Sequence, residues 1–158
     1  MKNMVLVLML LLTLSNFCFA YNLSGRWDCK LSNLSETDPP TLKKMERIVL
    51  NIESDGRRYL REGDFLWEYI SYPSLVIHTR TTEEGELAIT GQNIKFSPLG
   101  GEVKVLNSGP LNPKELEQEL LEHLLAEEDW VIKEYSAQKV TFEKLDEGYV
   151  DNCTRVDF

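Results

Sequence analysis

Residues 25–29 read Gly-Arg-Trp-Asp-Cys, and residues 153–155 near the other end of the chain read Cys-Thr-Arg. Two of the three cysteines, Cys29 and Cys153, therefore lie close to the two ends of the chain. In an oxidising compartment two such cysteines are expected to pair. The bond would close a loop containing most of the chain, which loop-closure models value at about 4 to 5 kcal/mol. The alternative is two separate buried thiols.

The first twenty residues have the pattern of a cleavable signal peptide. Lys2 supplies a positive start, residues 4–14 are almost entirely apolar, and small residues precede the expected cleavage site after Ala20. The apolar run is shorter than the roughly 20 residues that span a membrane. We therefore predict a signal peptide at residues 1–20 and a mature protein in the periplasm or outside the cell. The alternative is an uncleaved anchor.

Cleavage would leave 158 − 20 = 138 residues, a length that suits one domain over residues 21–158. The mature chain would carry 17 − 1 = 16 basic and 26 acidic residues, a formal charge of −10. This charge argues against nucleic acid as a partner and against insertion into anionic membranes after cleavage. It favours a basic protein partner, although solubility alone also explains it. We expect a monomer.

Most of the mature chain alternates apolar and polar residues in short stretches separated by turn signals, which is typical of antiparallel β structure. The breaks are expected at Asp55-Gly56, Gly63-Asp64, Pro73, Glu84-Gly85 and Pro98. The candidate strands are residues 25–31, 48–52, 57–62, 63–69, 75–81, 87–89, 94–96, 103–105, 130–134, 139–145 and 150–156.

One segment has helical periodicity. Asn112 and Pro113 supply a cap and a first-turn proline, and leucines then recur at helical spacing from Leu116 to Leu125. This predicts one amphipathic helix of about fourteen residues that ends near Glu128. Its acidic face is expected to lie in solvent, and consists of Glu115, Glu117, Glu119 and Glu122.

Many short strands and one late helix predict a mainly β fold, an antiparallel closed or nearly closed β-barrel. At residues 25–27 the Gly-x-Trp pattern resembles the signature that opens the first strand of lipocalins and related calycin barrels. A late helix followed by a final strand with an arginine is also similar to that family. The resemblance implies a lipocalin-like exported protein in which an arginine packs across Trp27 and closes one end of the barrel. The matching arginine is Arg155.

The spacing of these residues supplies a test of the resemblance. Trp27 precedes Cys29 by two positions, and Arg155 follows Cys153 by two. If the cysteines face each other across an antiparallel pair, the same register places Trp27 opposite Arg155 on the same face. A guanidinium over the indole ring would gain roughly 0.5 to 2 kcal/mol. The alternative is that Arg155 is an exposed residue of the tail.

The residues that carry chemistry form no recognisable catalytic pattern. His78 and His123 are isolated in the sequence, and neither has a second ligand at metal-binding spacing. No nucleophile-elbow glycine pattern surrounds a serine. We therefore expect no enzyme activity, no metal and no cofactor.

Two functions remain for a barrel of this kind. The first is binding of a small apolar ligand inside it, with Phe65, Trp67 and Tyr69 as lining residues. The alternative for these aromatics is ordinary core packing. The second is inhibition of a basic enzyme such as lysozyme. Small periplasmic lysozyme inhibitors are similar in combining a signal peptide, a barrel and a disulfide that joins the two ends.

Overall fold

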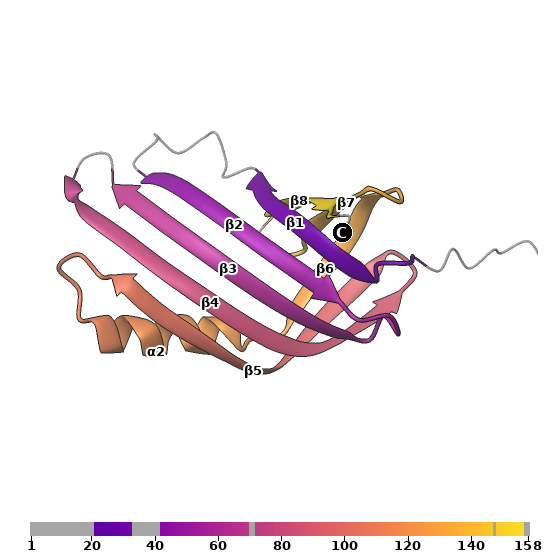
Figure 1. Cartoon of the computed structure of the whole chain (residues 1–158), viewed down its shortest axis with the longest axis horizontal. Coiled ribbons are helices and arrows are strands. Elements are labelled where there is room, and N and C mark those ends of the chain that lie inside the picture. Colours follow the sequence, from indigo (N-terminus) through magenta and orange to yellow (C-terminus); the bar gives the residue numbers. More distant parts are fainter. Residues whose placement is uncertain (1–20, 33–41, 70–71, 147, 157–158) are drawn as a thin grey trace, which may run out of the picture.

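The computed structural model describes residues 21–32, 42–69, 72–146 and 148–156, so the predicted signal peptide lies outside the described residues. The elements in chain order are β1 (Gly25–Ser32), β2 (Leu42–Ile52), β3 (Arg58–Tyr69), β4 (Tyr72–Thr90), β5 (Asn93–Asn107), α2 (Pro113–Leu124), β6 (Glu128–Tyr135), β7 (Lys139–Lys144) and β8 (Val150–Arg155). Each strand pairs with the next in antiparallel fashion, and β8 pairs with β1 (Figure 1). The predicted closed antiparallel barrel is confirmed.

The strands β2 to β5 are longer than the sequence predicts. Gly63, Pro73, Glu84-Gly85 and Pro98 all lie inside strands rather than between them, and β4 alone has 19 residues. The ladder absorbs the break at Glu84-Gly85 as a shift in register, which marks a β-bulge. Pro98 follows the last residue of β5 that pairs with β6, and such an edge position tolerates a proline.

The two ends of the chain meet as predicted. Cys29 forms a disulfide bond with Cys153 across β1 and β8, and the same register places Trp27 opposite Arg155. The Arg155 guanidinium carbon lies 4.4 Å from the centre of the Trp27 ring. Arg155 also donates hydrogen bonds to the backbone oxygens of Asn22 and Ser24. It is therefore a partly buried structural residue, and not an exposed tail residue.

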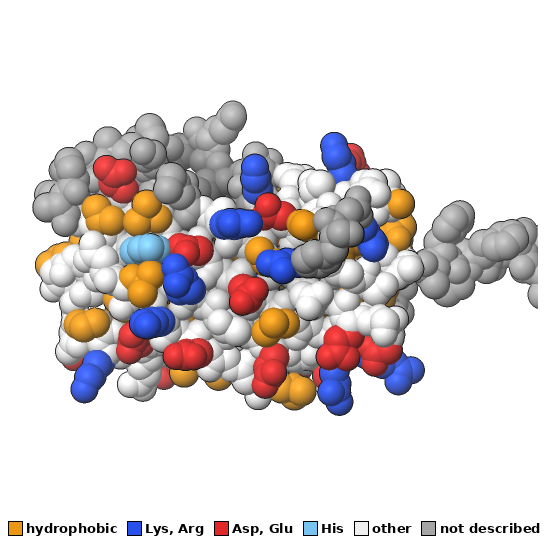
Figure 2. All heavy atoms as spheres, in the orientation of Figure 1, with side chains coloured by type: hydrophobic (Ala, Val, Ile, Leu, Met, Phe, Trp, Pro, Cys, Tyr) orange, Lys and Arg blue, Asp and Glu red, His pale blue; other side chains and the backbone are white. Residues whose placement is uncertain are grey.

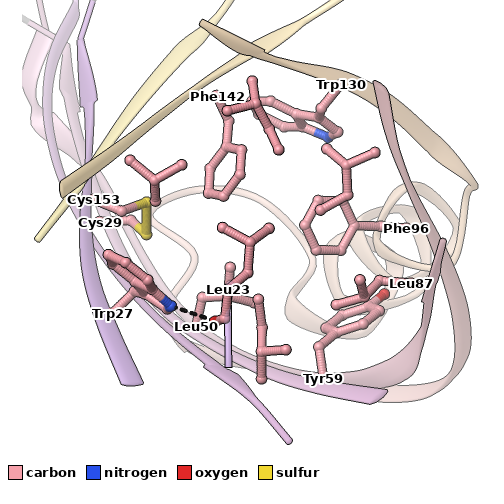
Figure 3. Close-up of a cluster of buried hydrophobic side chains, with 14 residues drawn as sticks. Leu23, Trp27, Cys29, Leu50, Tyr59, Leu87, Phe96, Trp130, Phe142 and Cys153 are labelled. Atoms are coloured by element: carbon pink, nitrogen blue, oxygen red, sulfur yellow. Dashed lines mark hydrogen bonds between the residues drawn. A yellow bond between two sulfur atoms is a disulfide. The ribbon is translucent and has the colours of Figure 1, made fainter. Parts of the chain in front are cut away.

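Leu23 packs beside Trp27 at this end of the barrel (Figure 3). Its side chain is buried, and its backbone oxygen accepts a 2.7 Å hydrogen bond from the Trp27 indole nitrogen (Figure 3). The backbone φ of Gly25 is +118°, a conformation that glycine adopts readily and other residues do not. An added Cβ there would lie 3.1 Å from Arg155 Nη1. Glycine at position 25 therefore permits both the turn into β1 and the close approach of the arginine.

The apolar core fills the half of the barrel next to this closed end. Figure 3 shows the disulfide, Trp27, Leu23 and rings from other strands directed toward one another. Phe96 contacts Tyr59 and Phe142 through edge-to-face ring packing. The buried residues of this core are Leu23, Trp27, Cys29, Leu50, Ile52, Tyr59, Leu87, Ile94, Phe96, Trp130, Ile132, Val140, Phe142 and Cys153.

Helix α2 packs along β5 at the other end of the molecule (Figure 1). Asn112 is its N-cap and accepts a hydrogen bond from the Lys114 backbone nitrogen, as its sequence predicts. The helix has 12 residues, and Glu128 already belongs to β6, so the predicted end is too late. Three strands follow the helix, as the alternation of the sequence predicts.

Glu117 does not have the expected solvent position. It is half-buried, and its Oε1 accepts a 3.0 Å hydrogen bond from the backbone nitrogen of Val105. Since β5 pairs with β6 only over Asn93 to Phe96, this N–H has no strand neighbour to accept it among the described residues.

Within the described residues, no helix is both long and apolar enough to cross a membrane.

Candidate functional site: a cavity with a charged floor

A cavity of about 240 Å³ lies inside the barrel, between the packed core and the end of α2. The strand alternation that buries Trp27 and Leu50 directs the odd-numbered side chains of β3 and β4 inward, toward this space. Its walls combine apolar and charged side chains. The lining residues are Glu46, Ile48, Arg61, Gly63, Phe65, Thr81, His123, Leu124, Glu128, Trp130, Lys144, Tyr149 and Asp151.

The charged floor of the cavity is a network of acidic and basic side chains around Arg61 on β3. Arg61 Nη2 lies 2.5 Å from Glu83 Oε2 on β4, and Arg61 Nη1 lies 2.8 Å from Glu128 Oε2 on β6. The Glu83 side chain is fully buried. Two carboxylates thus occupy the donors of one guanidinium, an arrangement of short charge-assisted hydrogen bonds.

Further partners complete this network. Tyr59 donates its hydroxyl hydrogen to Glu83, and burial raises the pKa of Tyr59 above its ordinary value. Lys144 on β7 lies 3.2 Å from Glu128, and Trp130 donates its indole hydrogen to the same carboxylate. Although burial acts to raise the pKa of Glu128, Arg61 and Lys144 lower it overall.

Asp151 on β8 is the exception in this network. Its side chain lines the cavity, the residue is 8 % exposed, and Oδ1 accepts no hydrogen bond from any residue of the described ranges. Burial raises the pKa of Asp151 to about 6, although Arg61 acts to lower it. A buried carboxylate without a hydrogen-bond partner is costly when ionised. Asp151 therefore brings to the cavity a carboxylate with one oxygen that accepts no hydrogen bond from the described residues.

Apolar side chains line another part of the cavity, which we call the apolar wall. Ile48, Leu124 and Trp130 contribute to it, and the Phe65 ring lies over Gly63. A Cβ on Gly63 would come within 2.2 Å of that ring. Glycine at position 63, which in the sequence resembles a break between strands, thus makes room for the ring inside the barrel.

The predicted lining residues have different positions. Phe65 lines the cavity as predicted. Trp67 lies two positions further along the same face, and its indole nitrogen donates a long 3.5 Å hydrogen bond to Glu46. The Tyr69 side chain lies outside the described residues. Of the three aromatics, only Phe65 is shown to border the cavity.

The two histidines are not equally isolated. His78 Nε2 lies 2.7 Å from Asp64 Oδ1 on the outer face, and Arg80 contacts the same carboxylate, partners that the sequence does not indicate. Hydrogen bonding by His78 lowers the pKa of Asp64. His123 borders the cavity. Throughout the described ranges, no three histidine, cysteine or acidic residues are grouped as metal ligands would be.

The interior charges are the functional candidates that sequence reasoning missed. Arg61 and Glu83 occur in phase with inward-facing apolar residues, so their alternation carried a usable signal. Gly63 and Glu84-Gly85 conceal this signal, because their composition is typical of breaks between separate strands.

The outer face over β2 to β4 mixes acidic and basic side chains rather than forming a patch of one sign (Figure 2). The basic protein partner stays a prediction from net charge.

Replacing Asp151 with asparagine should stabilise the protein at neutral pH. The pKa of Asp151 is about 6 in the folded protein, above its ordinary value of 3.8, so the folded state binds this proton more tightly. The stability that the protonated Asp151 carboxyl contributes is therefore fully present below about pH 4, and it is lost as the pH rises through about 6. Asp151→Asn should unfold at higher urea concentration than wild type at pH 7.5, and the difference should shrink toward pH 4. A variant less stable at pH 7.5 would contradict the pKa.

No family model matches the chain, and no curated protein matches it.

Proposed function

We propose that this chain is an exported binding protein that holds a small, largely apolar molecule inside the barrel, without catalysing a reaction. The observation that carries the proposal is the cavity of about 240 Å³ with its wall of Ile48, Phe65, Leu124 and Trp130. Binding sites for small molecules combine such apolar surfaces with a few fixed polar groups.

The rigidity of the surrounding barrel supports this proposal. The Cys29–Cys153 bond and the Arg61 network cross-link β1, β3, β4, β6 and β8. A preformed site loses little conformational entropy when it binds a ligand. The disulfide also fits an oxidising compartment outside the cytoplasm, which supports the proposal of export to the periplasm or beyond.

An uncharged fluorescent probe tests the proposal. N-phenyl-1-naphthylamine should bind one molecule per chain with increased emission, because the cavity removes the probe from water. Ile48→Trp should abolish this binding, since the larger side chain fills the cavity from β2. The measurement is a fluorescence titration of the folded mature protein at pH 7.5.

Val49→Trp is the matched control because Val49 is the next residue of β2 and lies on the opposite face of the sheet. It should bind the probe as the unmodified protein does. Probe binding that persists in Ile48→Trp would place the probe elsewhere on the molecule and overturn the proposal. Absence of binding to the unmodified protein would overturn it as well.

A further inference from the structure

The charges that face the interior do not balance. Four carboxylates and two basic groups are directed into the same region of the barrel, a formal excess of two negative charges when all are ionised. The carboxylates are Glu46, Glu83, Glu128 and Asp151, and the basic groups are Arg61 and Lys144.

The basic groups are already occupied by carboxylates. Arg61 uses Nε and Nη2 on Glu83 and Nη1 on Glu128. Lys144 contacts Glu128 as well. An anionic ligand would therefore have to displace a buried carboxylate from its partner, which leaves that carboxylate uncompensated.

Asp151 differs from the carboxylates that contact Arg61 and Lys144. The residue borders the cavity, and its buried Oδ1 has no hydrogen-bond donor within the described part of the chain. Glu46 also borders the cavity, and it accepts a long hydrogen bond from the Trp67 indole nitrogen. A donor that enters the cavity would find an acceptor at Asp151 and no competing cation at Oδ1.

We propose that the ligand of this cavity is an amphipathic amine, whose protonated nitrogen contacts Asp151 and whose apolar tail packs against Phe65, Leu124 and Trp130. This inference rests on the proposed binding function and names the chemical class of the ligand. A hydrogen bond between an ammonium group and a carboxylate is among the stronger ones in proteins. The amine would also reduce the negative excess of the interior.

The surroundings of Asp151 set the pH dependence of this binding. The charged groups that face it are Glu46 on β2, Arg61 on β3, Glu83 behind Arg61 on β4, Glu128 on β6 and Lys144 on β7, with His123 and Tyr149 also bordering the cavity. Arg61 and Lys144 are paired with carboxylates, whereas Asp151 has a pKa of about 6 and loses its charge in mildly acidic solution. Amine binding should therefore weaken by about tenfold between pH 7.5 and pH 5.

Three probes with the same eight-carbon tail test the proposal by calorimetry at pH 7.5. Octylamine should bind about 10- to 100-fold more tightly than octan-1-ol, the range expected for one charged hydrogen bond. Octanoate should bind more weakly than either. Asp151→Asn should reduce octylamine affinity at least tenfold, remove its pH dependence and leave octan-1-ol affinity unchanged. Asp64→Asn, an acidic residue of the outer face, is the control and should change none of these values.

The outcomes separate this inference from the proposed function. Equal affinities for octylamine and octan-1-ol, both lost in Ile48→Trp, would support the binding function and overturn the amine. Tightest binding of octanoate would overturn the amine too. If none of the probes binds, the proposed function fails and the inference with it. Should Asp151→Asn not fold, the pH profile of octylamine binding to the unmodified protein decides, and a flat profile would overturn the proposal.

Discussion

The double variant Cys29→Ala/Cys153→Ala should lose about 4 to 5 kcal/mol of stability. The disulfide joins residues separated by 124 positions, so its loss frees almost the whole described chain in the unfolded state. Urea unfolding should show a lower midpoint. It should also show a steeper dependence of the free energy of unfolding on urea, because the unfolded chain without the bond exposes more surface.

Val140→Ala controls for the loss of buried volume beside the bond. Val140 is buried on β7 directly opposite Cys153, but it takes part in no cross-link. This variant should lose about 1 to 2 kcal/mol, from the methyl groups alone, with an unchanged urea dependence. If the double alanine variant matched Val140→Ala in both quantities, closure of the loop would contribute nothing to stability.

Arg61→Met should destabilise the protein by about 3 to 5 kcal/mol, the range measured when one member of a buried ion pair is removed. The substitution keeps an unbranched apolar stem but leaves the fully buried Glu83 carboxylate without its cation. Glu128 would keep Lys144 as a partner, so Glu83 carries most of the effect. The measurement is urea unfolding at pH 7.5.

Two further variants define the cause of that loss. Arg58→Met changes an exposed arginine of the same strand and should remain within about 0.5 kcal/mol of wild type. Arg61→Met/Glu83→Gln should recover more than half of the lost stability, since the amide oxygen can still accept from Tyr59 and position 83 no longer buries a charge. A double variant as unstable as Arg61→Met would assign the loss to packing instead of charge.

The closed end of the barrel is the part that the sequence predicts best. Two cysteines and the equal spacing of Trp27 and Arg155 from them are enough to define the register of β1 against β8. Period-two alternation then predicts which side chains face inward. These signals are simple, because residue type and spacing along each strand are sufficient to recognise them.

The lengths of the strands and the interior charges could not be predicted in the same way. Gly63 has the composition of a turn, but its missing side chain provides space for a ring inside the barrel. Asp151 occurs in a polar stretch, and only the closure of the barrel around it makes it buried. Both properties arise from the meeting of distant segments, which spacing along one strand does not reveal.

The hydrogen bond between Glu117 and the backbone of Val105 has a consequence for self-association. Beyond Phe96, β5 has β4 on one side and α2 on the other. A carboxylate from the helix thus takes the place that a strand of a neighbouring molecule would otherwise occupy, and Leu124 of α2 lies beside Gly101 of the same strand. The helix therefore covers an edge of β5 that would otherwise be open to edge-to-edge pairing between molecules.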